Sequence, residues 1–327
     1  MHSRNFNGVP VSEVGLGTWQ IGGSWGEVSE DDSLAILRAA YERGVTFFDT
    51  ADVYGDGRSE RLIGRFLKED AHLIEPPFVA TKLGRGAKGW PESFTPEAMR
   101  EYVDGSLNRL GVSALDLIQL HCIPTEELRR GEVFETLRVL QSEGKIVRFG
   151  ASVESMEEAH ICLEQAGLAS LQIIFNIFRQ KPVNDLFSAA QDKGVALIVR
   201  LPLASGLLSG KMSKDTSFGP EDHRNFNRDG QAFNVGETFA GLPFEKGVEL
   251  ADELKAWVPY DLTMAQMAQR WILDYDVVTT IIPGASHVGQ VSSNVLVSDL
   301  PPLAPALHRR LREWYESKVK EHIRGPY

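Results

Sequence analysis

The regular alternation of short apolar runs with helix-like segments constrains the fold of this chain more than any other feature. Most of the runs are apolar at nearly every position, which is typical of strands covered on both faces, as in a parallel sheet. They occupy residues 12–17, 45–50, 78–83, 115–121, 146–152, 171–176, 195–200 and 277–282. Eight such runs, nearly all followed by a helix, predict an α/β fold of the (β/α)8 TIM barrel type.

Capping residues mark where several of the intervening helices begin and end. The segment at 95–111 begins with Thr95 and Pro96 and ends on Gly111, and Ser59 is predicted to cap a helix over 60–67. Serine, threonine and proline are favoured at helix starts, and glycine is favoured just after helix ends. Further helices are predicted at 31–44, 155–167, 182–194, 244–257, 264–275 and about 303–320.

The rival architecture is a doubly wound sheet, which usually carries the spacing G-x-G-x-x-G after its first strand. Neither the residues after 17 nor those after 50 have this spacing. We therefore expect residues 1–327 to form a single barrel domain. A stretch at about 205–243 is rich in glycine, asparagine, aspartate and serine. It follows the seventh run and predicts a long loop over the face where barrels keep their active sites.

Charge and cysteine content exclude several classes of function. The formal net charge is −11 and no run of basic residues occurs, so nucleic acid is not an expected partner. Cys122 and Cys162 are too few for a disulfide framework, and their spacing suits no metal site. The chain has no apolar stretch of membrane-spanning length, and its first residues lack the apolar core of a secretory signal. We expect a cytoplasmic protein with a small-molecule substrate.

Polar side chains end three successive apolar runs. Asp49 ends the second run, Lys82 the third and His121 the fourth, while Tyr54 lies in the loop after Asp49. Each has an ordinary explanation on its own: a turn aspartate, a solvated lysine, a core histidine and a half-buried aromatic. Together, however, they would meet at the barrel mouth, because catalytic groups of barrels lie at the carboxyl ends of the strands.

This group of four has a chemical logic. A lysine buried at the mouth needs a carboxylate partner, which Asp49 supplies. The cation of Lys82 would lower the pKa of Tyr54, because it favours the phenolate. Tyr54 would then be a general acid that protonates a carbonyl oxygen as hydride reaches the carbon, and His121 would donate a hydrogen bond beside it.

The motifs that carry these residues closely resemble those of the aldo-keto reductase superfamily. They are FFDTADVYGDGRSE at 47–60, VATKLG at 79–84 and LDLIQLHC at 115–122, with PLASGLLSGK at 202–211 and IPGA at 282–285. The resemblance implies a (β/α)8 barrel whose catalytic tetrad falls on Asp49, Tyr54, Lys82 and His121. It also implies an oxidoreductase that interconverts carbonyl compounds and alcohols with a nicotinamide dinucleotide.

The resemblance places the cofactor with some departures from the family pattern. By default the family uses NADP(H), but the Lys or Arg that grips its 2′-phosphate is absent near Ser286, so NAD(H) or dual use is also expected. Arg200 stands where the family stacks an aromatic on the nicotinamide, and Val153 replaces a common asparagine. The implied cofactor-binding residues are Gly17, Thr18, Trp19, Ser152, Gln172, Asn176, Arg200, Leu201, Pro202, Leu203, Ser205, Pro283, Gly284, Ala285, Ser286, Gln290 and Asn294.

Two other functions fit the same residues. One is a regulatory, nucleotide-binding member of the superfamily with little turnover, similar to the β-subunits of potassium channels. The other is a Schiff-base aldolase with Lys82 as nucleophile, although the charge of Asp49 works against a neutral amine. A metal centre is not expected, because His121 and Cys122 are adjacent rather than spaced for shared ligation.

Overall fold

Eight parallel strands form the centre of the molecule. The computed structural model describes residues 1–327 except 24, 27, 71–72 and 87–91. The strand order is β10-β9-β8-β7-β6-β5-β4-β3, so that every neighbour in space is also a neighbour in sequence. The strands are β3 (Leu16–Gly17), β4 (Phe47–Asp49), β5 (Phe78–Leu83), β6 (Leu117–His121), β7 (Phe149–Ser152), β8 (Leu168–Ile174), β9 (Ala196–Arg200) and β10 (Val278–Ile281).

The first and last of these strands meet and close the sheet into a barrel. Isolated parallel bridges join Val14 to Ile281 and Gly17 to Gly284. The amide of Gly17 donates to the carbonyl of Pro283 at 3.1 Å. A Cβ atom on Gly17 would lie 2.7 Å from the carbonyl oxygen of Ile282, so glycine is needed for this close approach. The predicted (β/α)8 barrel is confirmed.

The glycine spacing is a weaker argument against the doubly wound sheet than the sequence suggested. The spacing G-x-G-x-x-G does occur in this chain, as GRGAKG at 84–89, directly after β5. It follows the third barrel strand rather than the first strand of a dinucleotide-binding unit, and its last three residues lie outside the described part of the chain. The strand order, and not the glycine pattern, therefore decides the fold.

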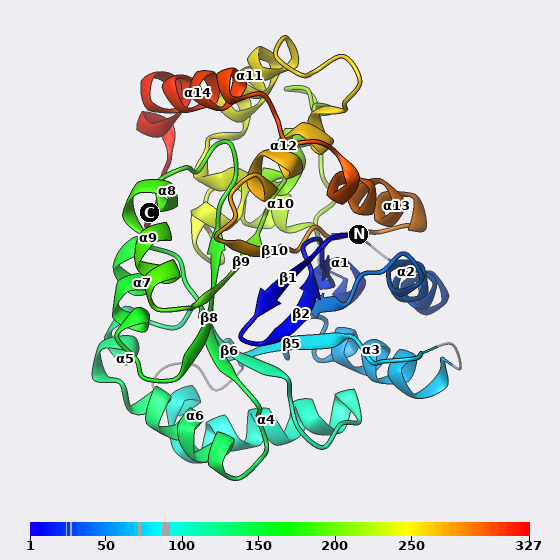
Figure 1. The fold of residues 1–327 in the computed structure, drawn as a ribbon, viewed down its shortest axis with the longest axis vertical. Helices are drawn as coiled ribbons and strands as arrows, with labels where there is room; N and C mark the ends of the chain where they lie inside the picture. The colour runs from blue at the N-terminus through cyan, green and yellow to red at the C-terminus, as the bar shows by residue number, and fades with distance from the viewer. Residues whose placement is uncertain (24, 27, 71–72, 87–91) are drawn as a thin grey trace.

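Helices surround the barrel (Figure 1). They are α1 (Trp19–Gly22), α2 (Glu30–Glu42), α3 (Arg58–Glu69), α4 (Pro96–Leu110), α5 (Thr125–Arg130), α6 (Glu132–Ser142), α7 (Met156–Leu163), α8 (Pro182–Asp185), α9 (Phe187–Asp192), α10 (His223–Phe226), α11 (Phe244–Lys255), α12 (Met264–Leu273), α13 (Val288–Val295) and α14 (Pro305–Trp314). Thr95 caps α4 by accepting a hydrogen bond from the amide of Ala98, and Gly111 follows its end in the left-handed conformation. Both agree with the predicted boundaries.

Three predicted helix features differ in the structure. Ser59 is not a cap: α3 begins at Arg58, two residues before the predicted start, and Gly57 precedes it. The Ser59 hydroxyl donates to that of Thr18 and accepts from that of Thr50 instead. The single helix predicted at 182–194 is two short ones, α8 and α9. The helix predicted at about 303–320 is α14, which continues as a π-helical turn at Tyr315–Val319.

A hairpin that the sequence did not reveal covers the amino-terminal end of the barrel. Strands β1 (Ser3–Phe6) and β2 (Val9–Ser12) pair antiparallel and lie across the barrel in Figure 1. Phe6 is fully buried, with its ring centroid 4.9 Å from that of Phe78 and 6.0 Å from that of Phe47. This end of the barrel is therefore filled by side chains, and the opposite end remains for a site.

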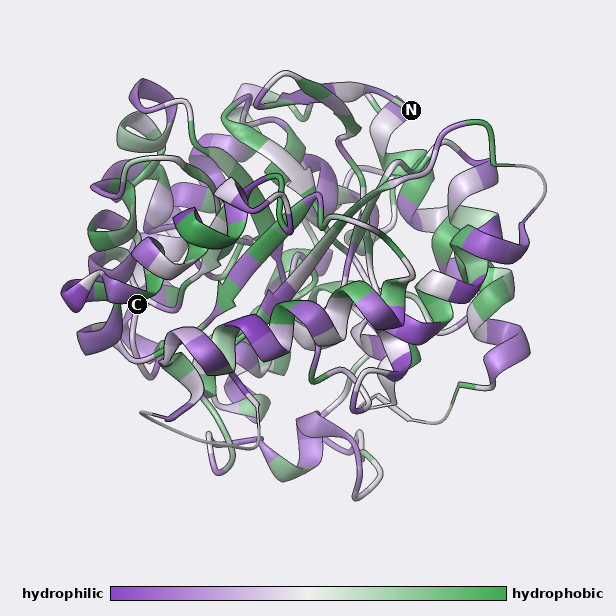
Figure 2. Ribbon diagram, turned by 90° about the horizontal axis from the view of Figure 1, so that it is seen from below, coloured by the Kyte–Doolittle hydropathy of each residue, from purple (hydrophilic) through white to green (hydrophobic). Residues whose placement is uncertain are grey.

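Apolar side chains fill two shells. A small inner cluster inside the barrel includes Phe6, Phe47, Phe78 and Leu117, and a larger outer cluster lies between the strands and the helices. In Figure 2 the central strands are largely hydrophobic, and the surrounding helices alternate hydrophilic and hydrophobic stretches. Among the residues that the structure describes, no helix combines the length and the apolar character needed to span a bilayer.

The predicted long loop at 205–243 has short ordered elements of its own. It contains most of a 3-10 turn, η2 (Ala204–Ser209), then α10 and two further turns, η3 (Val235–Glu237) and η4 (Phe239–Gly241). Arg324 fastens its end, because its guanidinium donates to the carbonyl oxygens of Gly241 and Leu242 at 3.0 and 3.2 Å. The loop therefore has a defined path next to the barrel.

Candidate active site at the barrel mouth

A buried ion pair lies at the carboxyl ends of β4 and β5. The Lys82 ammonium donates to the Asp49 carboxylate at 2.5 Å and to the carbonyl oxygen of Thr50 at 2.8 Å. Burial alone would lower the pKa of Lys82, but the charge of Asp49 and the hydroxyl of Tyr54 outweigh it, so this pKa lies above its usual value. Lys82 is therefore held as a cation with its charge compensated.

Tyr54 reaches this pair from the loop between β4 and α3. Its hydroxyl lies 3.3 Å from the Lys82 ammonium, and its ring stacks on that of Trp19 with centroids 5.9 Å apart. The prediction that Lys82 lowers the pKa of Tyr54 is wrong for the net effect. Burial raises this pKa, and the pull of Lys82 only partly offsets the rise. The side chain is thus a neutral phenol that already touches a cation.

His121 ends β6 on the other side of Tyr54. The two ring centroids are 5.9 Å apart and the planes are nearly perpendicular. Burial, together with the charges of Arg85 and Lys82, holds the pKa of His121 well below its usual value. The imidazole is therefore neutral at ordinary pH, with one N–H to donate and one nitrogen to accept.

Two glutamines complete the surroundings of Asp49. Gln172 from β8 donates to its second carboxylate oxygen at 2.7 Å, and Gln119 from β6 donates to the same oxygen at 3.3 Å. The carboxylate is thus hydrogen-bonded on both oxygens, as a buried charge requires. Gln172, one of the predicted cofactor-binding residues, lines the cavity and also supports the tetrad.

A cavity of about 330 Å³ opens above the tetrad. Asp49, Tyr54 and His121 line it, whereas Lys82 is fully buried behind Tyr54. Most of the predicted cofactor residues line the same cavity: Gly17, Thr18, Trp19, Gln172, Arg200, Leu201, Pro202, Leu203, Ser205, Pro283, Gly284, Ser286 and Gln290. The structure therefore brings together residues that come from both ends of the chain.

The other four predicted cofactor residues stand behind the cavity wall. Asn176 donates to the carbonyl oxygen of Leu201 at 3.0 Å, and Asn294 donates to that of Gly284 at 3.3 Å, so each supports the backbone of a lining residue. The Ser152 hydroxyl lies 3.5 Å from the Cys122 sulfur. Ala285 is buried between two lining residues.

The cavity extends across several strand ends of the barrel mouth. Its lining runs from Tyr54 past the loop after β9 to Ser286 and Gln290, beside the first turn of α13, where the amide of Ser286 donates to the Gln290 side chain at 2.7 Å. Leu201 and Ser205 have φ of 54° and 55°, a left-handed conformation that non-glycine residues rarely adopt outside functional sites.

Further lining residues were not among the predicted cofactor and catalytic residues. They are Gln20, Trp25, Gly206, Ser209, Lys211, Met212, Arg224, Glu237 and Ile282. The Trp25 ring centroid lies 5.5 Å from that of Trp19. His223 of α10 packs on both tryptophans, at 4.2 Å from Trp25 and 4.6 Å from Trp19. Aromatic rings from the long loop and from the segment after β3 thus form one wall.

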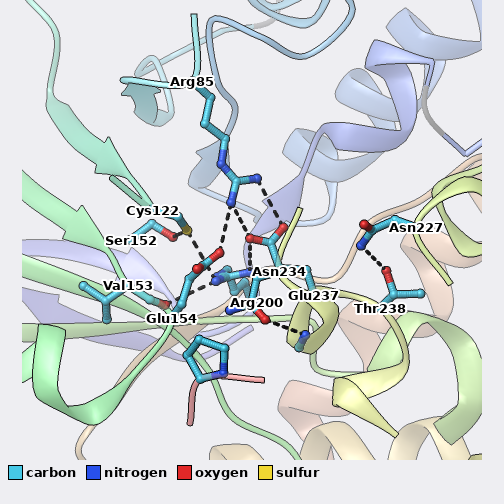
Figure 3. A network of polar contacts seen from close by, with 12 residues as sticks. Arg85, Cys122, Ser152, Val153, Glu154, Arg200, Asn227, Asn234, Glu237 and Thr238 are labelled. Atoms are coloured by element: carbon cyan, nitrogen blue, oxygen red, sulfur yellow. Dashed lines mark hydrogen bonds and ion pairs between the residues drawn. The ribbon is translucent and has the colours of Figure 1, made fainter. Parts of the chain in front are cut away.

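A second charged group, which the sequence did not predict, lies beside the tetrad. Figure 3 shows Arg85 pointing toward the carboxylates of Glu154 and Glu237, with Arg200 close by. Arg85 donates to Glu237 at 2.6 Å and to Glu154 at 3.2 Å, and Arg200 lies 3.5 Å from Glu237. We call these four residues the loop ion cluster. They come from four separate segments, so no local sequence pattern links them.

Fold and site together define a (β/α)8 barrel with Asp49, Tyr54, Lys82 and His121 grouped at a cavity of about 330 Å³ in its open end. The family model "Aldo/keto reductase family" matches residues 13–316. The aldo-keto reductase YhdN of Bacillus subtilis (strain 168) is 32% identical over 296 residues, which cover 88% of this chain and 85% of the relative. The chain therefore belongs to the aldo/keto reductase family.

Two further relatives have names that describe an activity. The chain is 29% identical over 308 residues to the NADH-specific methylglyoxal reductase of Escherichia coli (strain K12), covering 88% of this chain and 90% of that one. It is 31% identical to the glycerol dehydrogenase AKR11B4 from Gluconobacter oxydans, whose structure matches with a TM-score of 0.77 over 99% of this chain and 97% of that chain. Both relatives are oxidoreductases.

Proposed function

We propose that this protein is an NAD(P)H-dependent reductase of aldehydes or ketones that also works in reverse on alcohols. The observation that carries the proposal is the Tyr54 hydroxyl, which lies 3.3 Å from a buried lysine cation and faces the cavity. A carbonyl oxygen placed against this hydroxyl would meet a proton donor whose conjugate base is stabilised by Lys82.

Each residue of the tetrad has a distinct part in this proposal. Tyr54 gives its proton to the substrate oxygen, and Lys82 stabilises the phenolate that remains. Asp49 keeps Lys82 charged and in place, and the neutral His121 orients the carbonyl through a hydrogen bond. A bound nicotinamide nucleotide would supply the hydride. Arg200 and the segment 202–206, which line the cavity, would hold that nucleotide.

The environment of Lys82 argues against the aldolase alternative. A Schiff-base nucleophile must be a neutral amine that the substrate reaches. Lys82 is fully buried behind Tyr54, and its pKa is raised rather than lowered. A regulatory role with little turnover uses the same residues, and the measured rate of carbonyl reduction distinguishes it from the proposed enzyme.

We propose that the protein uses NADH and NADPH with only a modest preference. The residues at the adenosine end, Ser286 and His287, are not the cationic pair that usually grips a 2′-phosphate. Lys211 and Arg224 line the cavity and are the nearest candidates should NADPH be strongly preferred. We also propose a cytoplasmic location, which agrees with the free thiols of Cys122 and Cys162.

The test of the proposed function is Tyr54→Phe, which removes the hydroxyl and keeps the ring. We expect the turnover number for carbonyl reduction to fall by about 10²- to 10⁴-fold, because general acid catalysis contributes that much. Affinity for the nucleotide, measured by fluorescence titration, should hardly change. The assay follows NADH and NADPH oxidation with simple aldehydes, ketones and sugars. Normal turnover by the variant would refute the role of Tyr54.

A further inference from the structure

Glu237 connects the long loop to the floor of the active site. It lies on η3 and is 4% exposed, next to the fully buried Thr238 and Phe239. Its carboxylate accepts two hydrogen bonds from Arg85, at 2.6 and 3.3 Å, and lies 3.5 Å from Arg200. Arg85 follows β5 and Arg200 ends β9, so one side chain bridges two strand ends from outside the barrel.

The charges of the loop ion cluster make Glu237 its anchor. Burial would raise the pKa of Glu237, but Arg85 and Arg200 outweigh it and hold this pKa well below its usual value. Burial and the negative charge of Glu237 raise the pKa of Glu154 to about 7. Glu237 is therefore the permanent anion that both guanidinium groups share, and Glu154 is a weaker partner.

Arg200 depends on Glu237 for its position. Its guanidinium donates to the carbonyl oxygen of Val153 at 3.2 Å and lies 3.5 Å from the Cys122 sulfur. Cys122 and Val153 directly follow β6 and β7, and Glu237 adds an ion pair with the same guanidinium from the 205–243 loop. Without Glu237, the positive charges of Arg85 and Arg200 would repel each other in a largely buried site.

The backbone of Glu237 is tied to a different part of the cavity. The Ser205 hydroxyl donates to its carbonyl oxygen at 3.3 Å and accepts from the amide of Phe239 at 3.1 Å. Ser205 belongs to the strained segment after β9 that lines the nucleotide end of the cavity. Glu237 thus contacts the segment after β9 through its backbone, and Arg85 and Arg200 through its carboxylate.

We propose that Glu237 is a positioning residue that holds the 205–243 loop against the barrel and fixes the Arg200 guanidinium in the cavity wall. This role rests on the proposed function where it concerns the reaction, but the attachment of the loop does not depend on it. Loss of the carboxylate releases the loop, which weakens nucleotide binding and misplaces Arg200. Tyr54, Lys82, Asp49 and His121 keep their contacts with one another.

The experiment compares Glu237→Gln, Glu237→Asp and the full-length protein without substitution. Glu221→Gln is the matched control, because it removes an exposed carboxylate from the same loop. The first readout is the rate of tryptic cleavage after Lys211, Lys214 and Arg228 without nucleotide. The second is the Kd for NADH and for NADPH, and the third is the separate change in KM and kcat.

We expect Glu237→Gln to raise both the cleavage rate and the nucleotide Kd by about tenfold, the usual size of a coupling between two sites. KM should rise more than kcat falls. Glu237→Asp should recover much of the loss, because it restores the charge, and Glu221→Gln should behave like the unaltered protein. Arg85→Gln removes the same contact from the barrel side and should reproduce the Glu237→Gln cleavage rate, which keeps the test informative if one variant does not fold.

Two results would overturn the inference. Either Glu237→Gln is cleaved and binds nucleotide like the unaltered protein, or Glu237→Asp and Glu221→Gln are as impaired as Glu237→Gln. A protein that binds no nucleotide would instead contradict the proposed function. The cleavage rates would still decide whether Glu237 holds the loop.

Discussion

Two charged groups lie at the same end of this barrel and are built in different ways. The pair of Asp49 and Lys82 comes from adjacent strands, and their side chains are 3% and 1% exposed. The loop ion cluster comes mainly from loops, and Arg85 and Glu154 are 25% and 17% exposed. Sheet register fixes the first group, whereas the second group is complete only when the 205–243 loop, which carries Glu237, is folded against the barrel.

The two groups therefore act on their surroundings in different ways. Strands β4 and β5 are hydrogen-bonded in register, so Asp49 and Lys82 meet whatever the loops do. The loop ion cluster carries two positive and up to two negative charges in a partly exposed site. The strength of its ion pairs therefore changes with pH and with the position of the 205–243 loop. We expect substitutions of Asp49 or Lys82 to affect stability and chemistry together. Substitutions in the loop ion cluster should affect mainly nucleotide binding.

The largest effect is expected for Asp49→Asn, which leaves the Lys82 cation buried without a carboxylate. Removing one partner of a buried pair typically costs about 3–5 kcal/mol. We expect a loss of this size in the free energy of unfolding by urea at pH 7, together with loss of turnover. Asp56→Asn, in the exposed part of the loop that follows β4, is the control. A stable Asp49→Asn variant would show that pairing of β4 with β5 does not by itself make stability depend on the ion pair of Asp49 and Lys82.

An intermediate effect is expected for the pair Arg85→Gln and Glu237→Gln. Each single substitution leaves an unmatched charge in the cluster, whereas the double substitution removes both. The double variant should therefore lose less stability than the sum of the singles, by about 0.5–3 kcal/mol. Urea unfolding of the four proteins measures this coupling. Strict additivity would mean that the contact between Arg85 and Glu237 contributes no interaction energy of its own.

The smallest effect is expected for Glu154→Gln and depends on pH. The pKa of Glu154 in the folded protein is raised to about 7, because burial and Glu237 disfavour its charged form. The folded state thus holds this proton more tightly, so the contribution of Glu154 to stability is complete below pH 4.5 and declines as the pH rises to about 7. Arg85 limits the decline, since it also contacts the charged form.

Glutamine at position 154 cannot ionise, so this decline should disappear. Relative to the unaltered protein, Glu154→Gln should gain stability between pH 5 and pH 8 and be similar at pH 4.5, as measured by thermal unfolding across this range. A parallel pH dependence in both proteins would show that another group is responsible; Asp52, with its pKa also raised to about 7 by burial and Glu60, is the first candidate.

The strand residues of the site could be predicted because their spacing is set by the barrel itself. Asp49, Lys82 and His121 each end an apolar run, and parallel strands bring such ends to one place. Most of the cofactor residues followed from family motifs in the same way. The structure places them around one cavity, although their roles remain predictions.

What the sequence did not reveal depends on contacts between distant segments. Arg85, Glu154 and Glu237 lie in loops, and nothing in their neighbours marks them as a group. The wrong direction for the pKa of Tyr54 has a similar cause, because burial of its hydroxyl depends on how Trp19 and the loops pack above it. Ser59 looked like a helix cap, but Thr18, far away in sequence, takes its hydroxyl.

The amino-terminal hairpin has a consequence for the order in which the protein forms during synthesis. Arg4 donates to the carbonyl oxygens of Tyr275 and Val278, at 3.0 and 2.6 Å, across separations of 271 and 274 residues. Arg4 therefore cannot make these contacts until residues 275–278 have been synthesised. Pairing of such distant segments is slow, because loop closure must come before the contacts that reward it. Nascent chains that end before residue 284 would lack barrel closure, so the protein should gain protease resistance in a single late step.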